Sequence, residues 1–284
     1  MLGRATPSVV IPVFNAFDEL RACLESVAAT VGAQSQVIVI DDASTDERIV
    51  PLVASLLRAG GPRWRFVRQP RNVGFVATAN LGILLSHSDV VLLNTDTVVA
   101  PGWLERIGQC LASADDIATC TPWSNNGEIV SMPAFCKANP LPSDPATVAQ
   151  AIAQAAKQQG GPAYPEIPTA VGFCMGIASR ALDALGGFDT ERFGRGYGEE
   201  NDFSLRARSE GFRNVLCDDA YIGHHGGRSF GPLGLKPDEA SMRRLLERHP
   251  GYRDEITAFI EADPLSPLRE RLCAAVIDAG LSFD

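Results

Sequence analysis

The stretch DVVLLNTDT, residues 89–97, decides the fold that we expect. Its four consecutive large apolar residues, 90–93, are too few for a helix of ordinary length and are typical of a strand buried on both faces. Polar residues follow, so Asp96 lies at the carboxyl end of the strand. Open α/β sheets bind ligands at that edge, and a carboxylate there is suited to hold a divalent cation and, through it, nucleotide phosphates. An Asp that only caps the next turn is the alternative.

The composition is that of an ordinary globular chain of 284 residues, 45% of them hydrophobic. This length allows one large domain or two small ones. The net charge of −9 argues against nucleic acid as a partner, because phosphate backbones are held by clustered Lys and Arg. The seven Cys are scattered without a CxxC pair, so we expect buried thiols in a reducing compartment and neither zinc knuckles nor a disulfide framework.

The sequence contains no stretch that we expect to enter a membrane. The opening MLGRATP leads directly into a predicted strand, which does not resemble a signal peptide. No apolar run approaches the roughly 20 residues needed to span a bilayer. We therefore expect a cytoplasmic protein, whose membrane contact, if it has any, is peripheral at the inner face.

Strands and helices alternate strictly over the first 121 residues. The expected strands are 8–14, 36–40, 64–67, 89–97 and 117–121. Between them lie helical patterns, one of which we expect to start at Ser44 because Ser44 to Glu47 fits a capping box, with Pro51 tolerated in or near the first turn. This alternation predicts an α/β protein with a mostly parallel, doubly wound sheet and helices on both faces.

The pattern changes after Pro122. The Pro-rich residues 133–168 contain one helical segment, 146–158, and we expect this excursion to carry acceptor-binding loops. The sheet resumes near residue 169, and a further strand covers 215–222. Beyond Pro237 the chain is predicted to be helical, in pieces near 238–248, 252–262 and 267–280, as a buttress or as a connector within a longer polypeptide.

Two pairs of acidic residues lie at strand or helix ends. Asp41 and Asp42 follow strand 36–40 and would repel each other unless something stabilises them. A nucleobase N–H, a ribose hydroxyl or a cation could do so, and the helix dipole with water is the alternative. Glu199 and Glu200 begin a helix after a Gly-rich loop. Acidic residues favour a first helical turn for stability alone, but lids and catalytic carboxylates also tend to occur together.

Basic and imidazole side chains also lie at predicted strand or helix ends. Arg71, Asn72 and Gly74 precede a predicted helix, where a guanidinium and backbone N–H groups could face a pyrophosphate. Solvent-exposed loop residues are the alternative. His224 and His225 are adjacent at a strand end, and because neighbours on an extended chain point to opposite sides, at most one can reach a given metal.

The order and the type of these residues resemble the family-2 glycosyltransferases, inverting enzymes of the GT-A fold that use nucleotide-sugars. The resemblance extends from about residue 8 to residue 230. It rests on seven motifs: VVIPVFN (9–15), IDDAS (40–44), RNVGFVATAN (71–80), LNTDT (93–97), GGFD (186–189), GEEND (198–202) and HHGGRS (224–229). It implies a transferase domain over 1–235, with a nucleotide-binding half at about 1–125 and an acceptor-binding half at about 126–235. Residues 236–284 would then be a C-terminal helical extension.

The resemblance also implies a site for a UDP- or dTDP-linked sugar. Asp42 would accept a hydrogen bond from the base, and Asp96, which matches the last acid of the family's DxD signature, would hold Mn²⁺ or Mg²⁺. Asn94 replaces the first acid of that signature, which removes one negative charge but leaves an acceptor oxygen. His224 would complete the metal site, in preference to His225. The implied donor-binding residues are Pro12, Val13, Phe14, Asn15, Asp42, Arg71, Asn72, Gly74, Asn80, Asn94, Thr95 and Asp96.

The resemblance places the general base at Glu200, which matches the second acid of the family's ED pair. The family usually has Asp there, so Glu reaches one methylene further, and Asp202 and Glu199 are the alternates. Glu200 would take the proton from a hydroxyl of a glycan or lipid-linked acceptor as that oxygen attacks the anomeric carbon in a single displacement.

Other functional classes stay open. A nucleotide-sugar-binding module without turnover, part of a larger glycan-assembly protein, is compatible with Asn94 and with the helical tail. A nucleotidyltransferase would be expected to carry a Gly-rich, basic loop after the first strand, where this chain has the acidic, Gly-free NAFDEL (15–20). A dehydrogenase is disfavoured because no GxGxxG motif follows a predicted strand.

Overall fold

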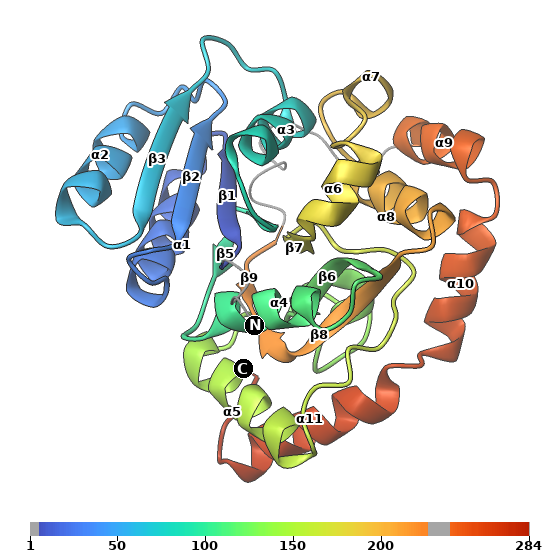
Figure 1. Ribbon diagram of the computed structural model, residues 1–284. Helices are drawn as coiled ribbons and strands as arrows, with labels where there is room; N and C mark the ends of the chain where they lie inside the picture. Colours follow the sequence, from blue (N-terminus) through green and yellow to red (C-terminus); the bar gives the residue numbers. More distant parts are fainter. Residues whose placement is uncertain (1–5, 227–238, 284) are drawn as a thin grey trace.

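The computed structural model describes residues 6–226 and 239–283 and is built on a seven-stranded sheet of order β3-β2-β1-β4-β7-β6-β8 (Figure 1). Every neighbouring pair is parallel except those of β7, which runs antiparallel to β4 and β6. A second, two-stranded sheet pairs β5 with β9. The strands are β1 (Ser8–Val13), β2 (Gln36–Asp41), β3 (Arg63–Arg68), β4 (Val90–Leu93), β5 (Thr97–Val98), β6 (Ile117–Trp123), β7 (Cys174–Ile177), β8 (Arg213–Tyr221) and β9 (Gly223–His224).

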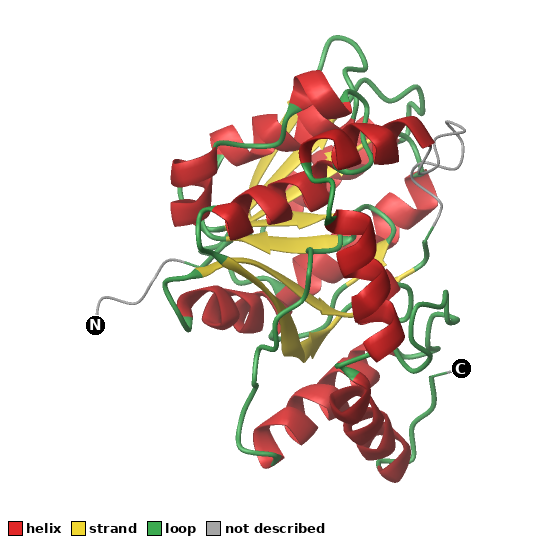
Figure 2. Cartoon of the chain, turned by 90° about the vertical axis from the view of Figure 1, so that its right-hand side faces the viewer, coloured by secondary structure: helices red, strands yellow, loops and turns green. Residues whose placement is uncertain are grey.

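Helices lie on either side of this sheet (Figure 2). They are α1 (Phe17–Thr30), α2 (Ile49–Ala59), α3 (Phe75–Leu85), α4 (Trp103–Ala112), the 3₁₀ turn Glu128–Val130, α5 (Pro145–Gln158), α6 (Ser179–Leu185), α7 (Thr190–Phe193), α8 (Glu199–Ser209), α9 (Glu239–Arg248), α10 (Tyr252–Ala262) and α11 (Ser266–Asp278). The predicted class, a mostly parallel α/β sheet between helices, is confirmed.

The middle of the sheet forms the core because its strands are apolar on both faces. All four residues of β4 are buried, as are Val37 to Ile40 of β2. Parallel strands covered by helices on both faces must be apolar throughout, which is why the run at 90–93 could be recognised in the sequence. The chain leaves this core at the carboxyl ends of β1, β2 and β4, and the polar motifs lie there.

The predicted helix start at Ser44 is wrong. Helix α2 begins at Ile49, and Pro51 lies in its first turn as expected. Ser44 does not cap a helix, because its Oγ accepts a hydrogen bond of 2.8 Å from the backbone N–H of Asn15. The residues that resemble a capping box thus form a loop that is tied to the end of β1.

The C-terminal pieces are three helices, close to the predicted ranges. Helices α9 and α10 lie beside α8, while α11 packs against α5 at the other end of the molecule (Figure 1). The predicted domain boundary at residues 235 and 236 lies outside the described residues, as do positions 227–229 of the HHGGRS motif.

The seven cysteines are all free. Five are buried, as predicted, but Cys136 is exposed and Cys273 is half-buried. Among the helices that the structure describes, none is both long and apolar enough to cross a membrane.

Candidate active site

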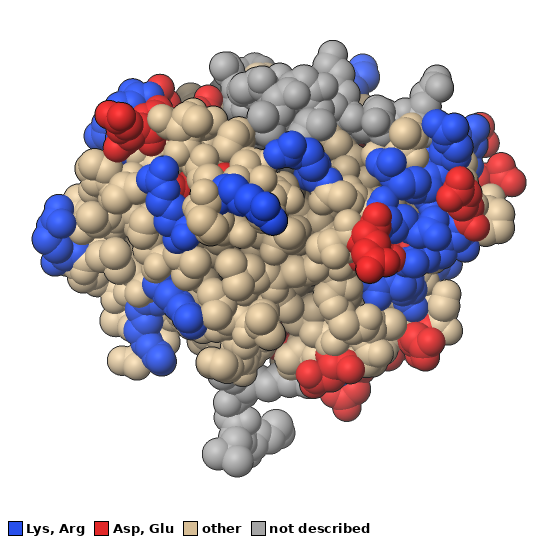
Figure 3. Space-filling view, turned by 90° about the horizontal axis from the view of Figure 1, so that it is seen from above, with Lys and Arg blue, Asp and Glu red and all other residues tan. Residues whose placement is uncertain are grey.

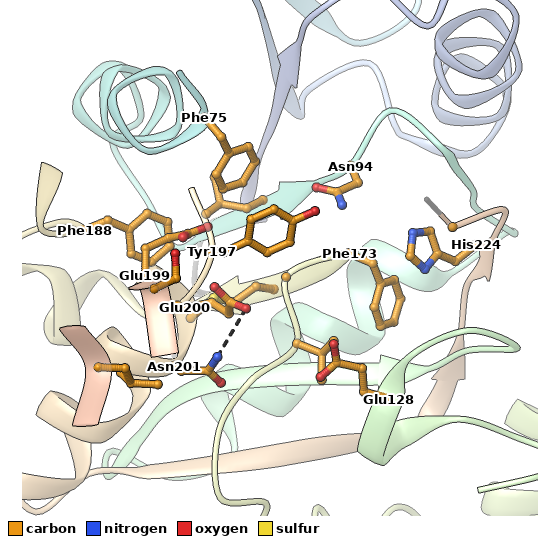
Figure 4. A pocket seen from close by; sticks show the side chains of 18 of the residues that line it. Phe75, Asn94, Glu128, Phe173, Phe188, Tyr197, Glu199, Glu200, Asn201 and His224 are labelled. Carbon is orange, nitrogen blue, oxygen red and sulfur yellow. Dashed lines mark hydrogen bonds between the residues drawn. The ribbon is translucent and has the colours of Figure 1, made fainter. Parts of the chain in front are cut away.

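A cavity of about 480 Å³ lies at the carboxyl end of β4 (Figure 4). Four of the predicted site residues line it together: Asn94, Asp96, Glu200 and His224. Its wall is completed by the loop after β6, the segment before β7, the start of α8, and helices α9 and α10. Those further lining residues include Phe75, Asn126, Glu128, Phe173, Phe188, Tyr197, Glu199, Asn201, Met242, Leu245, Tyr252 and Ile256.

Asp96 and His224, which are 128 positions apart in the sequence, meet because β5 pairs with β9. In this small sheet Thr97 is opposite His224, and the N–H of His225 donates to the carbonyl of Asp96 at 2.9 Å. The His224 Nε2 atom then lies 3.4 Å from Asp96 Oδ1. The ring stacks on Phe173 with centroids 5.2 Å apart, whereas the side chain of His225 is exposed. The two adjacent imidazoles therefore differ in position as the sequence predicted.

The orientation of His224 is fixed by its other ring nitrogen. Nδ1 lies 2.5 Å from the carbonyl oxygen of Asn126, so it carries a proton and donates to that oxygen. Burial lowers the pKa of His224, but the hydrogen bond to Asp96, the charge of Asp96 and the Asn126 carbonyl outweigh burial, so the pKa lies above its ordinary value. The ring therefore presents Nε2 to Asp96, either protonated or as a lone pair for a cation.

Glu199 and Glu200 form a pair of buried carboxyl groups at the start of α8. Burial, followed by the charge of Glu200, raises the pKa of Glu199 well above its ordinary value. Burial also raises the pKa of Glu200, to about 7, although hydrogen bonds from the backbone N–H groups of Glu200 and Gly198, and then from the Glu199 side chain, oppose that rise. The charge of Glu200 thus opposes ionisation of Glu199. Glu200 is the member of the pair that changes charge near neutral pH.

The Glu200 carboxyl faces the cavity and is only loosely held. Its Oε1 accepts a hydrogen bond of 3.4 Å from the Asn201 amide, and its Oε2 is buried without a partner among the described residues. The Tyr252 hydroxyl donates to Asn201 Oδ1 at 3.0 Å and so sets the orientation of that amide. A carboxylate with one unused, buried acceptor atom is suited to receive a proton from a ligand hydroxyl.

Asp202, one of the alternates for the base, has a different role. It is fully buried and does not line the cavity. Its oxygens accept hydrogen bonds from Arg206 at 2.8 Å, Arg248 at 2.9 Å and His249 at 3.0 Å. Because these donors come from α8 and the end of α9, Asp202 connects two helices. Glu199, the other alternate, lines the cavity and is paired with Glu200.

Asp42, Asn72 and Gly74 form a second group of predicted residues, beside the cavity but not lining it. Asp42 is buried, and its carboxylate accepts hydrogen bonds from the backbone N–H of Val73 and Gly74, both at 2.8 Å, and from Gln69 at 3.0 Å. The predicted repulsion between the acidic pair is thus relieved by groups of the chain itself. Contact between Asp42 and a nucleobase stays a prediction.

The remaining predicted donor residues are arranged as follows. Asn15 accepts hydrogen bonds from Thr45 and Asp46 and so holds the loop after β2, while Pro12 and Val13 end β1 beside it. Phe14 is half-buried, Thr95 is buried and Arg71 is exposed. None of these lines the cavity, and their contact with a donor stays a prediction.

Asn80 and Gly74 position the segments that lead to α8. The Asn80 side chain donates to the carbonyl of Phe188 at 2.8 Å and accepts from its N–H at 2.9 Å, so both ends of the amide are used within the chain. A Cβ on Gly74, whose φ is +93°, would lie 2.8 Å from the Cα of Arg195. This close approach requires Gly and seats the Gly-rich loop 194–198 on the start of α3.

Several cavity residues were not predicted from the sequence. Glu128 follows the SNNG turn, and burial of its carboxyl raises its pKa although the residue as a whole is exposed. Tyr197 interrupts the Gly-rich run, which was a usable signal, since an aromatic ring among glycines has no core to fill. Tyr252 and Ile256 lie on a helix that we expected to be a buttress or a connector, because its spacing resembles that of any amphipathic helix.

The sequence profile described as "Glycosyl transferase family 2" matches residues 8–186, more than half of the chain. The chain belongs to this family. The predicted recognition and fold are thereby confirmed, and the chain is a glycosyltransferase by family. The matched region ends before α8, so Glu200 and His224 lie outside it.

Known proteins agree with this assignment. An N-acetylglucosaminyltransferase of Mesorhizobium japonicum is 36% identical over 110 residues, 37% of this chain and 26% of that protein. Two solved structures share the fold. One is a mannosyltransferase of Pyrobaculum calidifontis in complex with GDP-Man and Mn²⁺, with a TM-score of 0.57 and 14% identity, where the match covers 99% of this chain and 77% of that one. The other is GalNAc-T7 with UDP, GalNAc and Mn²⁺, with a TM-score of 0.65 and 17% identity, where the match covers 99% of this chain and 55% of that one. The matches span only 33% to 55% of the length of several curated relatives.

Proposed function

We propose that this family-2 glycosyltransferase is an inverting, metal-assisted enzyme that moves a sugar from a nucleoside-diphosphate-sugar to a hydroxyl group of a glycan or lipid-linked acceptor. The observation that carries the proposal is the meeting of three groups in one cavity. His224 Nε2 lies 3.4 Å from Asp96 Oδ1, and Glu200, with a pKa of about 7, lines the same cavity. Diphosphate binding and proton removal would then take place side by side.

Asp96 and His224 fit a divalent cation. Neighbouring ligands of an octahedral ion with bonds of about 2.1 Å lie roughly 3 Å apart, close to the separation of these two atoms. The Asn126 carbonyl holds the Nδ1 proton and leaves Nε2 for the metal, as is usual for ligating His. Within the described residues no cluster of three or more His, Cys, Asp or Glu could hold a metal by itself. Diphosphate oxygens and water would therefore supply the other ligands, and the cation would neutralise charge on the leaving group.

The chain's own residues would carry out the proton transfer. Glu200 accepts the proton of the acceptor hydroxyl, and its unused Oε2 is the receiving atom. Asn201, held by Tyr252, keeps the carboxylate turned to the cavity. Asn94, at the end of β4, faces the cavity near Tyr197 and offers an amide to a ribose or sugar hydroxyl (Figure 4).

The proposal is tested by separating nucleotide binding from turnover. UDP, dTDP and GDP are added with and without Mn²⁺ while thermal unfolding is followed. A matching nucleotide at 100 times its Kd should stabilise the protein by about 2.7 kcal/mol. We expect Asp96→Ala to abolish the part of this stabilisation that depends on Mn²⁺. Asp183→Ala, which removes an exposed acid on α6, should leave that part unchanged.

Turnover is measured as release of nucleoside diphosphate from its sugar. Glu200→Gln should lower this rate about 10²–10⁴-fold while nucleotide binding persists. A wild-type protein that binds the nucleotide-sugar and never releases the diphosphate would instead be a binding module. Indifference to every nucleotide would exclude both functions.

A further inference from the structure

One wall of the cavity comes from the C-terminal helices α9 and α10. Met242 and Leu245 of α9 line it together with Ile256 of α10. These residues lie beyond residue 186, where the family match ends. The wall therefore belongs to a part of the chain that the family profile does not cover.

The apolar lining continues beyond this cavity. A second cavity of about 230 Å³ shares Glu128, Val171, Tyr252 and Ile256 with the first. Its other lining residues include Ile129 and Ile260. The two cavities thus share a wall, on which Val171, Ile256 and, in the second cavity, Ile260 are apolar, while Glu128 is the polar group common to both.

Each of the two cavities also has an exposed apolar side chain in its lining. Met242 is 37% exposed and Ile260 is 41% exposed, although both are large and hydrophobic. Within the described residues only three other large hydrophobic side chains are as exposed, and they lie on α2, α3 and α11. Exposed apolar residues that continue the lining of a binding cavity indicate a ligand surface.

Building on the proposed function, we propose that the acceptor carries a hydrocarbon group next to its reacting sugar, and that this group binds along α9 and α10 against Met242, Ile256 and Ile260. The sugar hydroxyl then lies at Glu200. The occupant is thus an amphipathic glycoside, whether its hydrocarbon belongs to a neutral aglycone or to a phosphate-linked lipid carrier.

The chemistry of the two sides of the cavity assigns the hydrocarbon to the acceptor. The nucleotide and its diphosphate need hydrogen-bonding and charged partners, which lie on the side of Asn94 and His224 (Figure 4). Asp96 is on the same side, 3.4 Å from His224 Nε2. On the α10 wall the Tyr252 hydroxyl is already bonded to Asn201. A sugar against Met242 and Ile256 would leave its hydroxyls without partners, at a cost in free energy, whereas a hydrocarbon chain gains by leaving water.

The test compares glycosides that differ only in chain length. Methyl and octyl β-D-glucoside, the latter below its micelle concentration, are titrated into the full-length protein with UDP and Mn²⁺ present. Each buried methylene should tighten binding about fourfold, so burial of three of them makes octyl glucoside bind at least 50-fold more tightly. A second arm of the experiment uses an octyl glucosyl phosphodiester to identify the carrier. If it binds tenfold more tightly than the neutral glycoside, the hydrocarbon belongs to a phosphate-linked lipid; if it binds equally, the hydrocarbon belongs to a neutral aglycone.

Variants locate the site. Met242→Ser and Ile260→Ser together should weaken octyl glucoside binding about tenfold and leave methyl glucoside unchanged, while Leu84→Ser and Ile277→Ser, exposed residues on α3 and α11, should alter neither. All four positions are exposed, so the fold should be kept. Equal affinity for the two glucosides, or equal losses in the control variants, would overturn the proposal. The glucoside ratio does not depend on turnover, and parallel nucleotide titrations would show separately whether the proposed function fails.

Discussion

The Glu200 carboxyl makes pH a direct probe of the proposed chemistry. Its pKa of about 7 arises mainly from burial, and hydrogen bonds from the backbone N–H groups of Glu200 and Gly198, followed by one from the Glu199 side chain, keep it from rising further. A general base must be deprotonated before it can accept a proton. The reaction should therefore be slow where Glu200 is protonated and fast where it is charged.

We expect kcat/KM to rise about tenfold per pH unit below pH 7 and to level off above it. Glu199→Leu removes the hydrogen bond that lowers the Glu200 pKa, so the rise should move to higher pH. Glu199→Gln keeps an N–H donor at this position and should leave the profile nearly in place. The profile is measured as nucleoside diphosphate release at limiting substrate. A wild-type rate that is constant between pH 5 and pH 8 would exclude Glu200 as the base.

Asp42 illustrates what single residues reveal in a sequence. The adjacent acids at 41 and 42 correctly indicated that hydrogen-bond donors must lie nearby. The donors to Asp42 are backbone N–H groups 31 and 32 positions further on, in the loop before α3. A backbone N–H carries no side-chain signature, so the sequence could predict the need for a partner but not its identity.

At the scale of elements, helix α3 is tied to the sheet through Gly82. A Cβ at this position would lie 2.1 Å from Val10 Cγ1 and 3.2 Å from Ile40 Cδ1. Real Cβ atoms do not approach other atoms so closely, so α3 would have to move away from β1. The helix begins at Phe75, which lines the cavity, and a shift would reach the site.

Gly82→Ala should therefore destabilise the protein by about 1–3 kcal/mol, as overpacking does, even though Ala is the better helix former by up to about 1 kcal/mol. Urea unfolding measures the change. Gly32→Ala is the matched control, because nothing lies within 4 Å of a Cβ there and its φ is not positive. A variant as stable as the wild type would mean that α3 sits further from the sheet.

The elements themselves were largely predictable, and the exceptions have physical causes. Apolar runs such as 90–93 give strands because both faces are covered. The predicted capping box at Ser44 does not form, because these groups bind Asn15 at the end of β1 instead. The Asn15 N–H donates to the Ser44 hydroxyl, and the N–H groups of Thr45 and Asp46 donate to the Asn15 side chain. Local patterns describe local bonds, and this competing partner is about 30 residues away. The cavity wall on α9 and α10 was missed because the spacing of its residues resembles that of any amphipathic helix.

At the scale of the whole molecule, ion pairs connect the C-terminal helices to the rest of the chain. Seen from above, basic side chains gather with acidic ones among them over the end where α7 to α10 lie (Figure 3). Arg208 pairs with Glu255, joining α8 and α10, and Arg248 of α9 pairs with Asp189 at 2.7 Å. These pairs are partly exposed and contribute little singly. The connection that matters energetically is the buried one, at Asp202.

Replacing Asp202 should show that α9 and α10 unfold together with the sheet. Asp202→Asn removes the negative charge that Arg206, Arg248 and His249 share. Breaking a buried ion pair costs about 3–5 kcal/mol, and since both arginines keep some contact with water, we expect about 3 kcal/mol. Urea unfolding should show one transition at lower denaturant with an unchanged m value, whereas Asp254→Asn, an exposed acid on α10, should change little. Two separate transitions would instead identify the C-terminal helices as an independent unit, and the acceptor wall that they form would then be able to detach from Glu200.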